Sequence, residues 1–335
     1  MPLYLKHAIL HSVQNNGKEP VISEVELEVD SETSEEFITR HVKRLIDNPA
    51  AKEAAFGEDS EVCILLQRLK DGEIFFKEAG VQIGRLLADI VRANDGIPAG
   101  DALITLFEMK KARYIAILKL NYLECYTHET VSRESGTDNQ LVKRAAVLPF
   151  GSGKVGEACL IPLDPAPFNL RVIEEPFVVD GESKFYFSEL FLKCEPQMSR
   201  REAAALLAEA AGGVAEKYCG GSFGAVVRAK AALVNEAAEN DGFVSLAGVA
   251  AAAFDGEEAR AEFAALAKDA GLRPEIFLGE KFAAQQFGTQ KLKAENGLEL
   301  RFPVELMEDG ASIEVKKGAD GTEIVLRHLG ALEAK

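Results

Sequence analysis

The sequence predicts an α+β protein with two domains, on three observations. Residues 102–122 are rich in Ile, Leu, Phe and Tyr around a short basic turn, which is typical of an antiparallel hairpin. Residues 199–270 are alanine-rich and favour helix, and short strand patterns return over residues 298–328. At 335 residues the chain is too long for one comfortable core. We therefore predict an N-terminal antiparallel sheet with packed helices (residues 1–198) and a C-terminal helical region ending in a small antiparallel sheet (residues 199–335).

The N-terminal domain is expected to open with a strand near Leu3–Val13, followed by an acidic segment. Residues 19–36 contain eight Asp or Glu and no Lys or Arg. The stretch Asp30–Glu36 suits a helix N-terminus, because carboxylates are favourable at the positive end of the helix dipole. The segment is either a solvated edge leading into that helix or a docking surface for a basic partner. The residues that would form such a surface are Glu24, Glu26, Glu28 and Asp30.

Two further helices are predicted near Ser60–Leu69 and Glu73–Arg92, the second with an apolar stripe. The texture then changes to strands. Ala102–Met109 and Arg113–Tyr122 form the predicted hairpin, with Lys110 and Lys111 in its tight connection. More strands are expected at Leu141–Leu148, Ala158–Leu163, Asn169–Ile173 and Lys184–Phe187.

The C-terminal domain is expected to begin at Ser199, which is placed as the N-cap of a helix with Glu202 at the capping-box position. Breaks are expected at Gly220-Gly221, Asp241-Gly242 and Asp255-Gly256. The closing strands are predicted at Leu298–Leu306, Ser312–Lys316 and Glu323–Arg327, the last two joined by a turn at Asp320-Gly321.

The net charge of −16 limits how the chain could bind a polyanion. Residues 1–198 hold 22 basic and 32 acidic side chains, and residues 199–335 hold 16 and 22, so neither half is basic. Non-specific DNA affinity comes mainly from cations that neutralise phosphates. Any nucleic-acid contact must therefore use a local cationic patch.

Four such patches are visible in the sequence. The alternative interpretation of each is a set of surface cations that offset nearby acids. A cationic hairpin tip or a helix N-terminus can lie against phosphates. The candidates are Lys110, Lys111 and Arg113 at the hairpin tip, Lys143 and Arg144 before a strand, Arg200 and Arg201 opening a helix, and Lys291 and Lys293 leading into the final sheet.

No motif in the sequence predicts catalysis. Residues 151–156 spell G-x-G-x-x-G, but a strand follows them where a dinucleotide site needs a helix. Asp309, Glu314 and Lys316 imitate the acid-and-lysine core of a metal-dependent nuclease, while their neighbours alternate as a simple amphipathic strand. We expect no enzymatic activity, no cofactor and no metal.

The five cysteines are far apart and form no Cys-x-x-Cys pair, so we predict buried, reduced thiols. No apolar run approaches the roughly 20 residues that cross a bilayer. The first residues lack the features of a signal peptide. A cytoplasmic protein is expected.

Three blocks carry a resemblance to a known family: Ile117–Tyr122, Ser188–Cys194 and Gly318–Thr322. In this order they resemble the bacterial 37-kDa nucleoid-associated proteins, and the resemblance extends over nearly the whole chain. It implies a location at the nucleoid and binding of double-stranded DNA, with single-stranded RNA as a second ligand. Contact with chromosome machinery such as a topoisomerase is also implied, so an acidic adaptor that recruits a basic protein is the alternative. A homodimer is compatible with the sequence.

Overall fold

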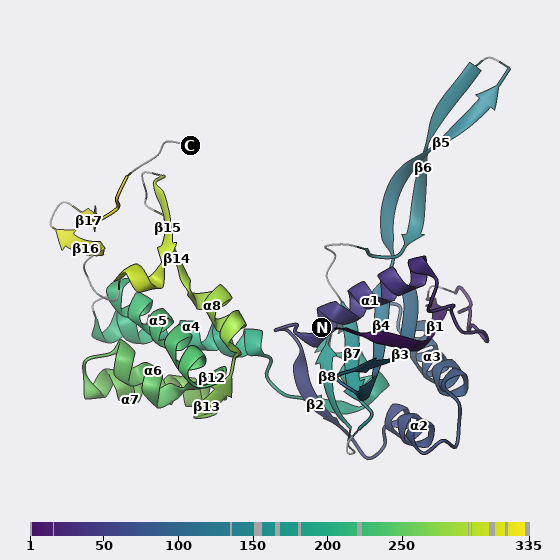
Figure 1. Ribbon diagram of the computed structural model, residues 1–335, viewed down its shortest axis with the longest axis horizontal. Coiled ribbons are helices and arrows are strands. Elements are labelled where there is room, and N and C mark those ends of the chain that lie inside the picture. Colours follow the sequence, from purple (N-terminus) through teal and green to yellow (C-terminus); the bar gives the residue numbers. More distant parts are fainter. Residues whose placement is uncertain are drawn as a thin grey trace. The chain divides into compact units, whose positions relative to one another are not determined.

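The computed structural model divides the chain into two compact units, Met1–Met198 and Ser199–Lys335 (Figure 1). Each unit is described by itself below. The residues that the structure describes are 2–15, 17–134, 136–150, 156–164, 168–179, 182–219, 223–293, 295, 297–307, 312–318 and 321–331.

A seven-stranded antiparallel sheet forms the centre of the N-terminal unit. Its strands follow the order β1-β3-β4-β7-β8-β2-β11, and every pair is antiparallel. The predicted α+β class, with an antiparallel sheet in the N-terminal half, is confirmed. The strand bounds, in sheet order, are Tyr4–Val13, Gly100–Met109, Ala112–Asn121, Glu157–Pro162, Asn169–Ile173, Lys52–Phe56 and Cys194–Pro196.

Helices cover both faces of this sheet, because its central strands are apolar on both sides (Figure 1). Helix α1 (Glu32–Ile46) packs Ile38, Val42 and Leu45 against one face. Helices α2 (Glu61–Lys70) and α3 (Phe76–Ala93) pack against the other. Ser31 caps α1 and accepts a hydrogen bond from the Ser34 backbone, so this helix begins inside the acidic stretch as predicted.

Two glycines let α3 lie directly on β1. A Cβ atom on Gly80 would stand 2.7 Å from Ile9 Cγ2, and one on Gly84 would stand 2.2 Å from His11 Cδ2. The buried His11 ring uses the space that Gly84 leaves and forms a 3.0 Å hydrogen bond with the Gly80 carbonyl. Burial lowers the pKa of His11, so the ring is neutral at physiological pH.

The outer edge of β1 is covered by the acidic segment that follows it. Val21 exchanges two backbone hydrogen bonds with Ser12, and the Leu27 amide donates to the Ala8 carbonyl at 2.8 Å. The Ser23 hydroxyl donates to the Leu10 carbonyl at 2.5 Å. An open strand edge is a template for aggregation, and this segment blocks it.

The predicted hairpin is confirmed as β3–β4, and its turn has unusual residues. Met109 pairs with Ala112, which leaves a two-residue loop of Lys110 and Lys111. Their φ angles are 53° and 66°. Two successive residues with positive φ define a type I′ turn, where Asn and Gly are normally found because other side chains are strained there.

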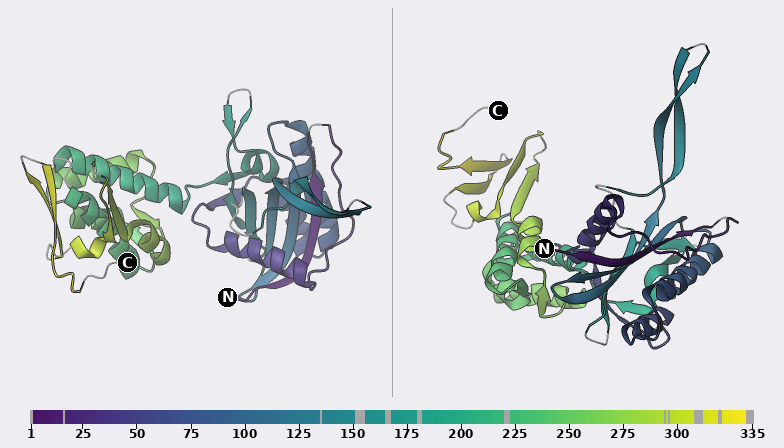
Figure 2. Two further views of the ribbon diagram at one scale, coloured as in Figure 1. Left: turned by 90° about the horizontal axis from the view of Figure 1, so that it is seen from above. Right: turned by 45° about the vertical axis from the view of Figure 1, so that its right-hand side comes forward.

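A long two-stranded ribbon, hereafter the arm, projects from the sheet of this unit (Figures 1 and 2). It consists of β5 (Leu123–Arg133) and β6 (Gly136–Val147), paired antiparallel. The predicted strand at Leu141–Leu148 covers only the second half of β6. The sequence did not indicate β5, because most of its residues are polar and its few apolar residues show no regular alternation.

The end of the N-terminal unit corrects one prediction. A small hairpin of β9 (Phe177–Val179) and β10 (Glu182–Lys184) is followed by the π-helix η1 (Phe187–Leu192). The predicted strand Lys184–Phe187 therefore ends at its first residue. Phe187 and Phe191 turn into the core, and this burial favours a helical turn over an extended strand.

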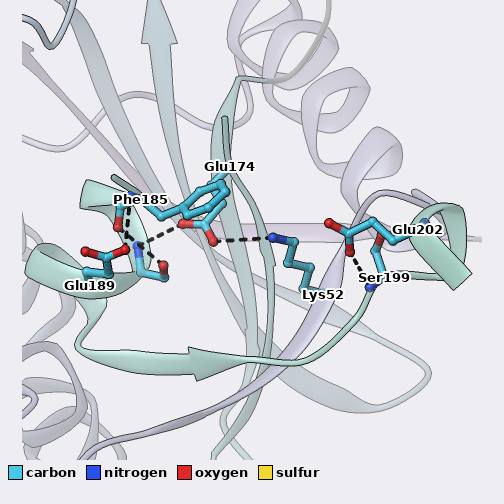
Figure 3. A network of polar contacts seen from close by, with 7 residues as sticks. Lys52, Glu174, Phe185, Glu189, Ser199 and Glu202 are labelled. Atoms are coloured by element: carbon cyan, nitrogen blue, oxygen red, sulfur yellow. Dashed lines mark hydrogen bonds and ion pairs between the residues drawn. The ribbon is translucent and has the colours of Figure 1, made fainter. Parts of the chain in front are cut away.

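The C-terminal unit is a helical bundle with an alanine-rich core. The Ser199 hydroxyl accepts from the Glu202 amide at 3.1 Å, and Glu202 Oε2 accepts from the Ser199 amide at 2.8 Å (Figure 3). The predicted capping box is confirmed. The helices are α4 (Arg200–Tyr218), α5 (Phe223–Glu239), α6 (Leu246–Ala253), α7 (Glu257–Asp269) and α8 (Glu280–Phe287).

Short antiparallel ribbons complete this unit. Residues 199–270 are not helical throughout, because β12 (Phe243–Ser245) interrupts them and pairs with β13 (Glu275–Phe277). The predicted strand Leu298–Leu306 ends at Pro303 and continues as the 3₁₀-helix η2 (Val304–Met307), since Val304 turns inward and is buried. The break expected at Gly220-Gly221 and the first residue of the turn expected at Asp320-Gly321 lie outside the described residues. The remaining ribbons are β14 (Thr289–Lys293) with β15 (Glu299–Pro303) and β16 (Ile313–Gly318) with β17 (Gly321–Leu326).

All five cysteines are free thiols. Cys159 on β7 and Cys194 on β11 are buried, whereas Cys63, Cys125 and Cys219 are partly exposed. Burial raises the pKa of Cys159 well above its usual value and that of Cys194 to about 12. Within the described part of the chain, no helix has the length and apolar character that a membrane crossing requires.

Replacing the basic turn by Lys110→Asn with Lys111→Gly is expected to stabilise the protein. Asn and Gly adopt positive φ with little strain, so the free energy of unfolding should rise by about 1–2 kcal/mol. Urea denaturation measures this. A control with glutamine at both positions removes the same charge without relieving the backbone. Equal stability of the two variants would contradict the strained turn.

Candidate nucleic-acid interface

The β14–β15 ribbon has one buried and one exposed face. Gln290 and Phe302 are paired across the ribbon and both are buried. The alternation of a strand therefore turns the neighbouring residues outward. On this outward face Lys291 stands directly opposite Arg301, and Lys293 stands opposite Glu299.

The outward face carries three cations, Lys291, Lys293 and Arg301, and one acid, Glu299. Lys293 Nζ lies 3.3 Å from Glu299 Oε1. No carboxylate among the described residues pairs with Lys291 or Arg301, and both side chains are exposed. Like charges directly opposite each other in a sheet are destabilising. An anion bound between Lys291 and Arg301 would attract both side chains and so turn their repulsion into a stabilising contact.

The β3–β4 hairpin tip is only partly free. Lys110 and Lys111 are exposed at the turn, and no carboxylate in the described parts of the chain pairs with either. Arg113, by contrast, lies 3.2 Å from Asp164 Oδ2 and donates to it from two guanidinium nitrogens. Two of the three predicted tip cations remain available to a phosphate.

Each predicted cation of the arm is matched by an acid. Lys143 Nζ lies 2.8 Å from Glu124, and Arg144 donates to Glu129 at 2.6 Å. A surface ion pair adds little stability, but it neutralises the charge that a phosphate would need. The arm is therefore a weaker phosphate site than its sequence suggested.

The two arginines that open α4 differ in availability. The Arg200 guanidinium donates to the Leu278 carbonyl at 3.4 Å and lies about 6 Å from the ring centres of Phe277 and Phe282. It is thus used in packing within its own unit. Arg201 is exposed.

The proposed docking acids lie on the segment that covers β1. Glu26 pairs with His7 at 2.7 Å. Glu24, Glu28 and Asp30 are exposed, and no described cation pairs with them. Three of the four predicted acids therefore face solvent on one short segment.

Among the described residues, the structure does not assemble the nuclease-like group that the sequence suggested. Glu314 pairs with Arg327 at 2.5 Å, while Asp309 and the Lys316 side chain lie outside the described residues. Where the structure describes side chains, no group of three His, Cys, Asp or Glu could hold a metal ion. Residues 151–155 of the G-x-G-x-x-G stretch also lie outside the described residues.

The N-terminal unit also holds a row of charged side chains, three of them buried and one partly exposed. We call it the charge row, and its members are the buried Lys119, Glu157 and Glu174 and the partly exposed Lys52. Lys119 on β4 pairs with Glu157 on β7, and both are at most 5% exposed. Glu174 follows β8 and has a side chain that is 1% exposed. Lys52 on β2 lies 4.0 Å from it (Figure 3).

Hydrogen bonds satisfy three members of the charge row. Lys119 Nζ donates to the Pro98 carbonyl at 2.7 Å and to Asn121 Oδ1 at 2.6 Å. Asn121 Nδ2 donates to Glu157 at 3.1 Å, and the Ser188 amide of η1 donates to Glu174 at 3.0 Å. Burial lowers the pKa of Lys119 to about 8 and raises the pKa values of Glu157 and Glu174.

The charge row lies where the arm joins the sheet. Asn121 ends β4 immediately before the arm, and Glu157 begins β7 after it. Their side-chain hydrogen bond therefore joins the end of β4 to the start of β7, the two sheet strands that flank the arm in the sequence. Tyr122, between β4 and β5, donates to Asp101 at 2.5 Å and hydrogen-bonds with Ser12 at 2.9 Å.

Sequence reasoning missed Arg301 and the charge row. Arg301 becomes visible only once residues 289–293 are recognised as the strand opposite it. Lys119 lies within the block Ile117–Tyr122, which the family resemblance singles out without giving this lysine a role. A lysine inside an otherwise apolar strand is itself a signal, because lysine is almost never buried without a partner.

Substituting Lys119→Met is expected to destabilise the protein by about 3–5 kcal/mol, because Glu157 would be left as an uncompensated buried charge. Adding Glu157→Leu should recover part of this loss, since both charges are then gone. Urea denaturation of the two single variants and the double variant gives the coupling. Additive losses would contradict the pairing.

The pH dependence supplies an independent check of Lys119. The unfolded chain keeps the lysine proton up to its ordinary pKa of 10.5, whereas the folded protein releases it near 8. The unfolded state thus binds more protons between these values, so stability rises with pH there. Relative to Lys119→Met, the wild type should gain stability from pH 8 toward 10. Parallel curves would contradict the lowered pKa.

Comparison with known proteins identifies the family. A family model described as nucleoid-associated protein YejK matches residues 9–329. No curated protein sequence matches the chain. The family model covers most of the chain, including the blocks that carry the predicted resemblance. The chain therefore belongs to this family of nucleoid-associated proteins.

Proposed function

We propose that this protein is non-enzymatic and contacts double-stranded DNA through the outward face of the β14–β15 ribbon. Family membership supplies the nucleoid-associated role. The observation that carries the DNA contact is Lys291 opposite Arg301, two exposed cations for which no described carboxylate is a partner.

The shape of the ribbon suits this role. A two-stranded ribbon is narrow enough to enter the major groove of B-DNA. Residues two apart on a strand are separated by about 7 Å. Lys291 and Lys293 therefore present charge along the strand, while Arg301 adds charge across it. The acidic remainder of the chain repels DNA, which limits binding to this local surface.

An acidic adaptor remains the second candidate. It is supported by Glu24, Glu28 and Asp30, which are exposed on one segment and have no described cation as partner. Such a surface would attract a basic chromosome-associated protein, as the resemblance to the family implied. Single-stranded RNA is a less favoured ligand of the ribbon, because its outward face carries no aromatic side chain for stacking.

The substitutions Lys291→Ala with Arg301→Ala are expected to weaken duplex binding about tenfold at low salt. They should also reduce the slope of log affinity against log salt by about 2, because two phosphate contacts are lost. Fluorescence anisotropy with a labelled duplex at several salt concentrations measures both values.

The matched control is Lys217→Ala with Arg327→Ala. It removes the same charge from the same unit at positions already paired with Glu262 and Glu314. Equal loss in both double variants would show a general charge effect. Absence of duplex binding by the wild type would contradict the proposal and favour the adaptor. Pull-downs after nuclease treatment, with the wild type and with a variant in which Glu24, Glu28 and Asp30 are neutralised, would then test the adaptor.

Plasmid DNA incubated with the protein and Mg²⁺ or Mn²⁺ is expected to remain supercoiled, because Glu314 is paired with Arg327 and no group of three His, Cys, Asp or Glu among the described residues could hold a metal ion. Agarose electrophoresis detects nicking. The Glu314→Gln variant is the control. Metal-dependent nicking that disappears in this variant would overturn the non-enzymatic assignment.

A further inference from the structure

The arm leaves both of its outer edges open. Among the described residues, β5 and β6 pair only with each other. Each outer edge therefore presents a row of backbone N–H and C=O groups without a strand beside it. An isolated two-stranded hairpin is marginally stable in water, and an open edge is a ready template for another strand.

Exposed apolar side chains on the arm also favour a strand partner. Tyr126 is 65% exposed and Leu141 is 76% exposed. In the register of the arm Tyr126 pairs with Lys143 and His128 pairs with Leu141, so both apolar residues lie on one face. Exposed apolar side chains beside an open edge favour a protein partner.

The charges of the arm do not suit a polyanion. Residues 123–147 contain four Asp or Glu and three Lys or Arg. Each Lys or Arg lies within ion-pair distance of an acid of the arm, the third being Arg133 at 3.9 Å from Asp138. A partner with a matching, nearly neutral edge is favoured over DNA.

The sequence of β6 is complementary to itself. Leu141 lies near the middle of the strand, with Asp138 three residues before it and Arg144 three residues after it. If two copies of β6 pair antiparallel about Leu141, Asp138 stands opposite the partner's Arg144, and Arg144 stands opposite the partner's Asp138. The two leucines meet at the centre.

The faces of the strand are consistent with this register. A two-fold axis between paired strands must be perpendicular to the sheet, so opposite residues keep the same face. Asp138 and Arg144 are an even number of residues apart and satisfy this condition. Arg144 already donates to Glu129, but a guanidinium carries five donors and can hold a second carboxylate.

The β5 edge offers such complementarity only over a short overlap at its end. Pairing about Glu129 would place that carboxylate opposite its own copy. Pairing about His128 would place Glu124 opposite Ser132, and Glu129 opposite Thr127, so no ion pair would form between the copies. Pairing about Val131 would place Glu129 opposite the copy's Arg133, but Arg133 ends β5, so only five residues of each strand would overlap. Pairing of β6 about Leu141 overlaps eleven residues of each strand, and this longer overlap selects β6 as the pairing edge.

We propose that the arm is a self-association element, in which β6 strands from two copies pair antiparallel about Leu141 and form a four-stranded sheet. This inference does not depend on DNA binding. It assigns the arm to a second copy of this chain, with two reciprocal ion pairs and a central leucine contact fixing the register.

Sedimentation of the full chain from low to high micromolar concentration tests the proposal. The wild type should dimerise. Asp138→Arg and Arg144→Asp should each weaken the dimer about tenfold or more, because like charges become opposed across the axis. The double variant should restore it, because the two ion pairs re-form with exchanged charges.

Glu134→Arg is the matched control, because it makes the same charge change at the arm's end, outside β6. It should leave the dimer unchanged. A wild type that stays monomeric, or a dimer that neither charge reversal weakens, would overturn the proposal. So would a monomer whose DNA affinity depends on these arm residues.

Cross-linking fixes the register separately. Residues paired with their own copy have Cα atoms about 4.5–5.5 Å apart, within reach of a disulfide. Leu141→Cys should therefore cross-link two chains under mild oxidation. Thr137→Cys on the same strand should not, since its two copies would be far apart, and the wild type measures the background from native cysteines. Equal cross-linking of the two variants would contradict pairing about Leu141.

Discussion

The structure of the N-terminal unit depends on keeping one ammonium group out of water. Lys119 is 1% exposed, and it is tolerated because Pro98, Asn121 and Glu157 surround its nitrogen with acceptors or opposite charge. These partners come from three separate parts of the chain, so the ammonium fixes how they meet. Gly100 contributes by its lack of a side chain, because a Cβ atom there would lie 2.8 Å from Lys119 Nζ. The register of β4 with β7, the start of the arm after Asn121 and the position of η1 beside Glu174 are all fixed by polar contacts in the charge row, at one end of an otherwise apolar core.

Local patterns in the sequence predicted the elements that bury one continuous apolar face. The β3–β4 hairpin and the helices α1 to α5 follow from such patterns, and the capping box at Ser199 follows from two residues. Strand β5 could not be found this way, because most of its residues are polar and its apolar residues do not alternate regularly. The charge row was hidden for a related reason: its members are single charged residues on different strands, and only the register across β4, β7 and β8 unites them. The role of Arg301 was hidden for the same reason, because it becomes visible only when β14 is recognised as the strand opposite it.

The distribution of cations, more than their number, decides where an acidic chain can meet a polyanion. Arg113, Lys143, Arg144 and Lys293 have acids beside them, and Arg200 is packed on aromatic rings. Of the predicted cations, those that remain are on a small surface of the β14–β15 ribbon, in the basic turn of β3–β4 and at Arg201. Such limited surfaces bind weakly one at a time. Presenting two copies on one assembly would raise their effective concentration for a single duplex, provided that both can reach it.

The five cysteine thiols differ in how readily they would react with oxidants, because they differ in burial. Reaction with peroxide requires a thiolate that solvent can reach. Cys159 and Cys194 meet neither condition, because burial keeps them protonated inside the sheet. Oxidative damage to the described fold would therefore begin at Cys63, Cys125 or Cys219, which are partly accessible. Of these, Cys125 belongs to the projecting arm, so oxidation there would alter the arm and leave the buried thiols of the central sheet unchanged.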